Sequence, residues 1–145
     1  SYTLDIYGPL VDYSAEELLG NNFQYKGVIP AEHVNRVLVD YDVLVLPTFW
    51  TCEGYPGIIA EAFNSGLPVI ATKMGGIPEM IQDNSNGFLI ESKSEIALKE
   101  AILKISKDNY PSMSGLALKS FENYDSNVVN KRILAHICDE LVSNK

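Results

Sequence analysis

The amino-acid sequence predicts an α/β fold in which a parallel β-sheet is flanked by helices. Short apolar runs rich in β-branched and aromatic residues alternate along the chain with segments of helical periodicity. That order is typical of parallel strands joined by crossover helices. The run Val43–Leu46 is apolar at every position, as a central strand covered on both faces must be. Glycine and proline cluster after two of the apolar runs, which marks loops between the elements.

Five strands are expected from the apolar runs and the turn residues around them. Their predicted ranges are Thr3–Tyr7, Phe23–Lys26, Val43–Pro47, Val69–Thr72 and Phe88–Ile90.

Two helix starts are predicted in the first part of the chain. The stretch Ser14–Glu17 has the pattern of a capping box, in which the serine and the glutamate satisfy the first amides of a helix. Pro30 stands where a first-turn proline opens a helix that carries Val34, Val37 and Leu38.

Two further helices are predicted towards the C-terminus. After Ser94, apolar residues recur three or four positions apart, so we expect a helix whose apolar stripe faces the sheet. The tail from Ser126 should pack one face on the body. Its apolar residues recur at four-residue intervals, at Val129, Ile133, Ile137 and Leu141.

Composition indicates one folded domain over residues 1–145. With 46% apolar and 21% charged residues, a chain of this length can bury about 70% of the surface that it exposes when unfolded. No apolar run approaches the roughly 18 to 20 residues of a membrane-spanning helix. The net charge of -8, with few and scattered Lys and Arg, argues against nucleic acid as a partner. Cys52 and Cys138 form neither a disulfide framework nor a metal signature, so we expect free thiols in a cytosolic protein.

The segment from Val43 to Glu79 is predicted to carry the chemistry. In it, the loop Glu53-Gly54-Tyr55-Pro56-Gly57 follows a strand and opens a helix over Ile58–Ser65. The first amides of a helix have no internal partners, and its dipole is positive there, so this helix start favours an anion. Gly54 and Gly57 would let a phosphate approach the backbone closely. Gly75-Gly76 repeats the arrangement one strand later.

Two glutamates, Glu53 and Glu61, bracket this anion site with seven residues between them. The spacing alone is weak evidence, but Glu61 is expected one helical turn beyond the anion site. A carboxylate there cannot neutralise a phosphate, although it can accept hydrogen bonds from sugar hydroxyls. The implied ligand therefore contains both a phosphate and a sugar.

These motifs resemble the donor-binding half of the retaining glycosyltransferases of family 4. The stretches EGYPGIIAEA, GLPVIAT, GGIPE and NGFLI follow one another in the family's order, and the resemblance covers Tyr7 to about Ile90. It implies that the chain is the Rossmann-like C-terminal half of a GT-B fold. It also implies a retaining, metal-independent hexosyltransferase-type enzyme, without a cofactor, that moves a sugar from a nucleotide-sugar to an acceptor in polysaccharide or glycoconjugate synthesis.

The resemblance assigns roles to individual residues. Glu53 would contact the transferred sugar as the catalytic residue, and Glu61 would hold the ribose hydroxyls. The amides that follow Gly57 would receive the distal phosphate, and the backbone at Val28 would meet the edge of the base. The donor-binding residues expected in this way are Glu61, Gly54, Tyr55, Gly57, Ile58, Ile59, Gly8, Pro9 and Val28; no metal ligand is expected.

The resemblance also implies parts that this chain lacks. A full enzyme would be about twice as long or more, with an acceptor-binding domain, and then a strand and loop carrying an Arg and a Lys for the diphosphate, before the present first residue. Its donor would be a UDP-, GDP- or ADP-linked sugar, and its acceptor would be bound mainly by the missing N-terminal domain. We expect weak donor binding and no turnover from this chain alone. The expected location is the cytoplasm, and peripheral contact of the full-length enzyme with the inner membrane surface stays open.

Other functions fit parts of the same pattern. A sugar-nucleotide epimerase or a phosphorylase would share the fold, and a non-catalytic binding module would use the glycine loops for a phosphate alone. Glycoside hydrolysis by Glu53 and Glu61 needs facing carboxylates with a sugar between them. We disfavour hydrolysis because Glu61 is expected on a helix beside a phosphate site.

Several residues have a structural interpretation beside a functional one. Asp40-Tyr41-Asp42 spells an acidic metal-binding pair, but we expect it at the amino edge of the sheet, in a structural role. Lys73 is interpreted as a solvated loop lysine rather than a phosphate contact, and Glu79 as a first-turn helix acid. The interpretation stays open for the aromatic residues, which would either line the site or pack the loop. These are Phe49, Trp50 and Tyr55. Residues expected on the surface are His33, His136, Glu95 and Glu100.

Overall fold

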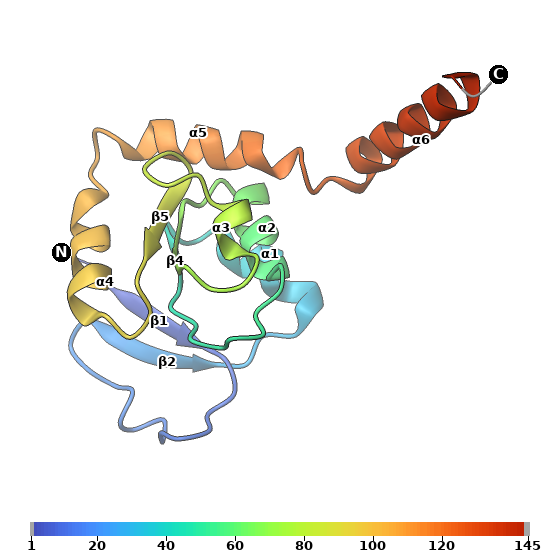
Figure 1. Ribbon diagram of the computed structural model, residues 1–145. Coiled ribbons are helices and arrows are strands. Elements are labelled where there is room, and N and C mark those ends of the chain that lie inside the picture. The colour runs from blue at the N-terminus through green and yellow to red at the C-terminus, as the bar shows by residue number, and fades with distance from the viewer. Residues whose placement is uncertain (1, 144–145) are drawn as a thin grey trace. The chain divides into compact units, whose positions relative to one another are not determined.

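A computed structural model describes the backbone of residues 2–143 and the side chains of residues 2–136 (Figure 1). Two compact units make up this chain. The first comprises the residues up to Arg36, and the second begins at Val37.

The first unit contains a two-stranded parallel sheet. Strand β1 (Leu4–Tyr7) pairs with β2 (Phe23–Gly27), and Leu4 lies opposite Phe23. Both strands begin and end within one residue of the predicted ranges. A parallel pair needs a long connection, and here the connection is an irregular loop.

The helix predicted after Ser14 does not form. The two hydrogen bonds of the capping box are present, from the Ser14 amide to the Glu17 carboxylate at 2.8 Å and from the Glu17 amide to Ser14 Oγ at 3.4 Å. They hold the pKa of Glu17 below its usual value. They close only a turn, because Leu19 is 68% exposed and Gly20 follows it, so nothing extends or packs a helix.

The helix predicted after Pro30 is present but short. It starts as the 3-10 helix η1 (Ala31–His33) and continues as α1 (Val34–Leu38). His33 is exposed, as expected.

The second unit is built on a three-stranded parallel sheet in the order β3-β4-β5. Its strands are β3 (Leu44–Leu46), β4 (Val69–Thr72) and β5 (Gly87–Ile90). Helix α2 (Gly57–Asn64) connects β3 to β4, and α3 (Ile77–Met80) connects β4 to β5. The parallel strands and crossover helices confirm the predicted α/β class. Every residue of the central strand β4 is buried.

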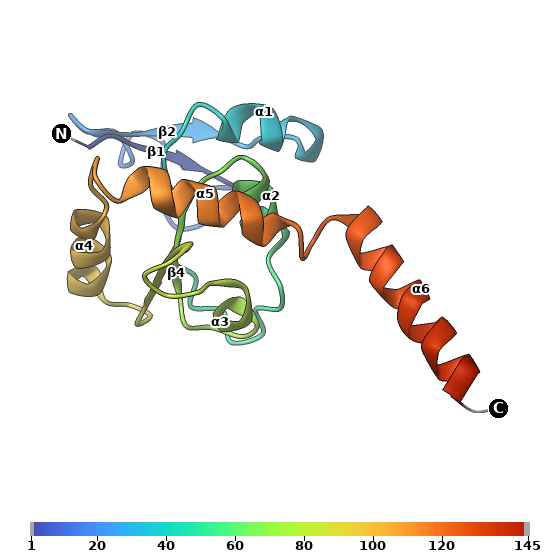
Figure 2. The same cartoon turned by 90° about the horizontal axis from the view of Figure 1, so that it is seen from above.

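Two longer helices complete the core of the second unit. Helix α4 (Glu95–Lys104) begins after Ser94, whose hydroxyl accepts a hydrogen bond from the Ala97 amide at 3.1 Å. Its apolar stripe packs against β4 and β5, as predicted. Helix α5 (Tyr110–Phe121) lies along α2 in both views (Figures 1 and 2). The chain returns to α2 at Tyr124, whose ring centre lies 6.4 Å from that of Phe63.

The C-terminal helix α6 (Ser126–Ser143) begins at the predicted residue. Of its predicted apolar stripe, the described side chains are Val129, which is half-buried, and Ile133, which is exposed. Ile133 and Leu134 are 51% and 62% exposed. A stripe at four-residue intervals drifts around a helix with 3.6 residues per turn, so it offers the body only a narrow apolar face. Ile137, Cys138 and Leu141 lie outside the described side chains. Over residues 2–143, no helix is both long and apolar enough to cross a lipid bilayer.

Substitution of Gly87 tests the close approach of β4 and β5. A Cβ at this position would come within 2.1 Å of the Val69 carbonyl oxygen. We therefore expect Gly87→Ala to lower the free energy of unfolding by about 3 kcal/mol, the upper range for an overpacked core. The free energy is measured by urea unfolding.

Gly115→Ala is the matched control, because a Cβ at this glycine in α5 meets nothing within 4 Å. Alanine inside a helix should raise the free energy of unfolding by about 0.5 to 1 kcal/mol. Equal unfolding midpoints for the two variants would contradict the packing described.

Candidate functional site

Two glycine-containing loops lie at the carboxyl edge of the second unit's sheet. The Glu53 loop (residues 47–56) follows β3, and the Gly75 loop (residues 73–76) follows β4. Because β3 and β4 are adjacent and parallel, both loops leave the sheet at the same edge, where ligands bind in open α/β sheets. Asp40 and Asp42 precede β3 and therefore lie at the opposite, amino edge, as expected.

The two loops approach each other backbone to backbone. Gly75 has a φ of +50°, and a Cβ on it would fall 1.6 Å from the Glu53 carbonyl oxygen. The Gly76 amide donates a hydrogen bond to the Gly54 carbonyl at 3.1 Å. The buried Thr72 hydroxyl donates another to the Thr48 carbonyl. The Glu53 loop is therefore fastened to the end of β4 at several points.

A side-chain bond joins the same two segments. The Tyr55 hydroxyl donates to the Glu79 carboxylate at the start of α3, and this bond raises the pKa of Tyr55. A Cβ on Gly76 would lie 3.1 Å from the Tyr55 ring, so the ring packs on this glycine. These contacts agree with loop packing of Tyr55, and a sugar contact stays a prediction. Glu79 is the first-turn acid expected, but sequence reasoning missed its partner, which lies 24 residues away.

The amino end of α2 is open. The helix begins at Gly57 after an extended Pro56, and no side chain caps it. The Ile59 amide donates to the Pro56 carbonyl at 3.0 Å, whereas the amides of Gly57 and Ile58 lie in the first turn, where helices provide no partner. A Cβ on Gly54 or Gly57 would meet nothing within 4 Å. The protein's own packing therefore requires neither glycine.

Three predicted site residues differ in their surroundings. The Ile59 side chain is fully buried, so it offers no atom to a ligand, and its amide is already bonded. Glu53 and Glu61 are each half-buried. Their carboxylates have no hydrogen-bond or ion-pair partner among the residues that the structure describes.

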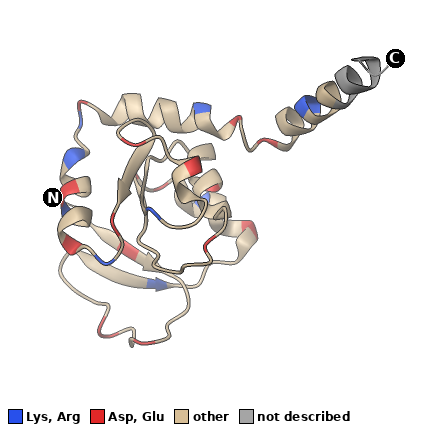
Figure 3. Cartoon of the chain, viewed as in Figure 1, with Lys and Arg blue, Asp and Glu red and all other residues tan. Residues whose placement is uncertain are grey.

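Lysines at the same edge of the sheet have partners of their own. Lys73 Nζ lies 2.7 Å from the Glu91 carboxylate, which raises the pKa of Lys73. Both side chains are exposed, in agreement with a solvated loop lysine. Lys93, which sequence reasoning did not single out, places Nζ 4.9 Å from the centre of the Phe49 ring. Across the described chain, Lys and Arg are scattered over separate elements (Figure 3).

The aromatic residues of the Glu53 loop are exposed. Phe49 and Trp50 have exposed fractions of 64% and 67%. The interpretation of these residues as buried anchors of the loop is therefore wrong. Lys93 Nζ lies over the Phe49 ring, and the Trp50 amide donates to Thr48 Oγ1 at 3.2 Å, but neither contact buries its aromatic ring.

The first unit holds the remaining predicted residues. Gly8 has a φ of +132°, its amide donates to the Gly27 carbonyl at 3.0 Å, and its carbonyl accepts from the Tyr25 hydroxyl at 2.8 Å. Gly8 and Pro9 line a cavity of about 230 Å³. Val28 follows the Gly27 turn and is 66% exposed.

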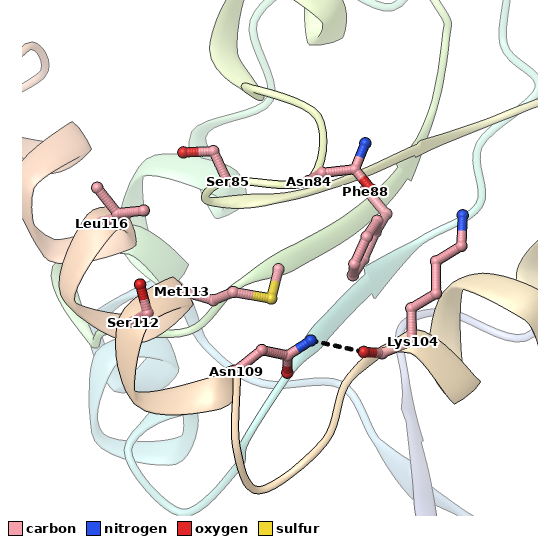
Figure 4. A pocket seen from close by; sticks show the side chains of 8 residues that line it. All are labelled: Asn84, Ser85, Phe88, Lys104, Asn109, Ser112, Met113 and Leu116. Atoms are coloured by element: carbon pink, nitrogen blue, oxygen red, sulfur yellow. Dashed lines mark hydrogen bonds between the residues drawn. The ribbon is translucent and has the colours of Figure 1, made fainter.

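A second cavity, of about 300 Å³, lies at the amino end of β5, away from the two loops (Figure 4). Figure 4 shows Asn109 donating to the Lys104 carbonyl, at 2.7 Å. The residues that line this cavity are Asn84, Ser85, Phe88, Lys104, Asn109, Ser112, Met113 and Leu116. Within the described part of the chain, no group of three His, Cys, Asp or Glu side chains could hold a metal ion.

Gly75→Ala tests the contact between the loops. The new Cβ would collide with the Glu53 carbonyl, and alanine is strained at a φ of +50°. We expect the free energy of unfolding to fall by about 2 to 4 kcal/mol, measured by urea unfolding. The emission of Trp50, the chain's single tryptophan, should shift as the loop moves. Gly54→Ala is the control and should leave the free energy of unfolding and the Trp50 emission unchanged, because a Cβ at that position meets open space. A Gly75→Ala variant with wild-type stability and unchanged emission would refute the contact between the loops.

Comparison with known proteins gives consistent matches. The family described as "Glycosyl transferases group 1" matches residues 2–124. The amylovoran biosynthesis glycosyltransferase AmsK of Erwinia amylovora is 34% identical over 85 residues, which cover 56% of this chain and 21% of AmsK. The putative colanic acid biosynthesis glycosyltransferase WcaL of Salmonella typhimurium is 25% identical over 129 residues, covering 83% of this chain and 31% of WcaL.

Solved structures share the fold. The pneumococcal O-GlcNAc transferase GtfA, solved with UDP and GlcNAc, has a TM-score of 0.70 at 24% identity and covers 96% of this chain. Anabaena HepE, solved with UDP-glucose, has a TM-score of 0.68 at 21% identity and covers 82%. Both have the GT-B fold. This chain spans 29% of GtfA and 33% of HepE, and similarly small shares of the curated relatives. Since the family match extends over residues 2–124 of the 145, the chain belongs to the group 1 glycosyl transferases.

Proposed function

We propose that this chain binds the nucleotide-sugar donor of a retaining, metal-independent glycosyltransferase of family 4 that works in polysaccharide or glycoconjugate synthesis. The observation that carries the proposal is the open amino end of α2, flanked by Gly54 and Gly57 in empty space. The activity is proposed for the full-length protein, because this chain spans only about a third or less of its relatives.

The distal phosphate of the donor fits the start of α2. Free amides at Gly57 and Ile58, together with the positive end of the helix dipole, favour an anion. Glycines at 54 and 57 leave room for a phosphate to reach those amides, since no protein atom lies where a Cβ would be. Ile59, although expected among the donor-binding residues, is given no phosphate contact, because its side chain is buried and its amide bonds to the Pro56 carbonyl.

The sugars of the donor fit the two glutamates. Glu61, a half-buried residue, lies one turn along α2 from the proposed phosphate position. We assign it the ribose hydroxyls, because a carboxylate accepts hydrogen bonds from hydroxyls but repels phosphate. Glu53 precedes the helix in the loop that is fastened to β4, and we assign it the transferred sugar as the catalytic residue.

We propose that the nucleoside and the acceptor contact residues outside the second unit. Gly8, Pro9 and Val28 are proposed to meet the nucleoside. The acceptor is proposed to bind mainly to an N-terminal domain, and the enzyme to work in the cytoplasm, including at the inner membrane surface. For this chain alone we propose weak donor binding without turnover. UDP is the first nucleotide to test, ahead of GDP and ADP, because GtfA and HepE were solved with UDP or UDP-glucose.

Two substitutions in the full-length protein separate the roles of the glutamates. Glu61→Ala should raise the donor Kd by about 10-fold or more, the effect of losing one charge-assisted hydrogen bond. Glu53→Ala should instead lower kcat by about 100-fold, the scale of a lost transition-state contact, at a nearly unchanged donor KM. Steady-state kinetics and calorimetric titration measure both. Glu95→Ala, at an exposed helix position, is the control. Unchanged kinetics for both Glu61→Ala and Glu53→Ala would overturn the assigned roles. Product formed without an acceptor would favour an epimerase.

Gly57→Ala tests the phosphate position in the chain itself. The new methyl group meets no protein atom within 4 Å, so the unfolding midpoint should not fall. The methyl group would obstruct a phosphate at the α2 amides, so the affinity for UDP should fall by about 10-fold, or roughly 1.4 kcal/mol. NMR titration of millimolar UDP into the wild type, Gly57→Ala and Gly115→Ala measures this. A Gly57→Ala affinity equal to that of the wild type would exclude the proposed phosphate position.

A further inference from the structure

Few contacts within the segment between Glu53 and α2 restrict its backbone. It contains Gly54 and Gly57, and glycine leaves the backbone more conformational freedom than other residues. Neither glycine is confined by neighbouring atoms, since a Cβ on either would meet open space. The segment therefore needs contacts from outside if the Glu53 side chain is to keep one position.

Those contacts come from one place, the Gly75 loop and the start of α3. The backbone of Glu53 and Gly54 rests on Gly75 and Gly76. Tyr55, which stands between the two unconfined glycines, is 61% exposed, so burial of its ring does little to hold it. Its hydroxyl bond to the Glu79 carboxylate supplies the side-chain attachment.

Glu79 lies in helix α3, which is packed into the core. Helix α3 has two core residues, Ile77 and Met80, with exposed fractions of 0% and 4%. The Glu79 amide donates to the Gly76 carbonyl at 3.1 Å, which ties it to the loop that touches Glu53 and Gly54. The backbone of Glu79 is therefore held in place, and its exposed side chain accepts the Tyr55 hydroxyl from that position.

We propose that Glu79 is a positioning residue of the transfer reaction, which acts through the Tyr55 hydroxyl to hold the Glu53 loop and thereby the Glu53 carboxylate. This inference rests on the proposed function of Glu53. It assigns Glu79 no contact with the donor. Its carboxylate already accepts the tyrosine hydroxyl, and a second negative charge beside a diphosphate would repel it.

The experiment compares four variants of the full-length enzyme, Tyr55→Phe, Glu79→Ala, Glu79→Gln and the double variant Tyr55→Phe/Glu79→Ala. Misplacement of a reacting group by about 1 Å can cost 100-fold in rate. We expect kcat to fall by about 10- to 100-fold in Tyr55→Phe and Glu79→Ala, and no further in the double variant. Glu79→Gln keeps an oxygen acceptor and should restore most of kcat. The donor KM should stay within about twofold throughout, because the phosphate and ribose contacts are intact.

Two controls separate positioning from general damage to the fold. Glu95→Ala removes a comparable first-turn acid from α4 and should leave kcat unchanged. Tyr55→Phe keeps the ring that packs on Gly76, so it carries the test even if Glu79→Ala folds poorly. Trp50 emission should change in Tyr55→Phe and Glu79→Ala but not in Glu95→Ala, because Trp50 lies in the same loop as Glu53.

The outcomes distinguish this inference from the function on which it rests. If the unchanged enzyme transfers no sugar from UDP-, GDP- or ADP-linked donors, the proposed function fails. If the enzyme is active and Tyr55→Phe retains full kcat, the positioning role alone is overturned. Additive losses in the double variant, or a Glu79→Gln variant as slow as Glu79→Ala, would also overturn it.

Discussion

The close approach of the Glu53 loop to Gly75 determines the form of the whole carboxyl edge. A carbonyl oxygen occupies the space that a side chain would need at Gly75, and the next amide, at Gly76, bonds back to Gly54. This contact joins the end of β4, the most deeply buried strand, to a loop that has little core of its own. This contact is one of several that connect the buried core to the candidate site, together with the Thr72–Thr48 and Tyr55–Glu79 hydrogen bonds.

Helix α2 combines a buried face with an uncapped amino end. Ile59, Ala62 and Phe63 are fully buried and attach the helix to the core. Glu61 lies on the same helix but remains half-buried, and the amino end stays uncapped. A capping side chain would stabilise such a helix by about 1 kcal/mol. The helix therefore depends on its buried face, and its first amides have no partner within the helix.

Sequence patterns predicted the core and the order of the motifs well, because both depend on local composition. Val69–Thr72 coincides with the fully buried strand β4. The run Val43–Leu46, expected to be the central strand, instead forms the half-buried strand β3 at one end of the order β3-β4-β5. Ser94 caps α4 as expected. The capping box at Ser14 failed as a helix signal because two end bonds cannot replace a packed face. The bond between Tyr55 and Glu79 joins residues far apart in the chain, so only the folded backbone reveals it. The exposure of Phe49 and Trp50 follows from the path of the loop, which periodicity does not describe.

Tyr124 packs against the core of the second unit, where its ring contacts that of Phe63. The family match ends at this residue, and the apolar residues Ile133 and Leu134 of the helix that follows are exposed. Changes at these exposed positions should therefore leave the core of the second unit undisturbed. Among related enzymes, we expect sequences to diverge in this tail sooner than in the segment that ends at Tyr124.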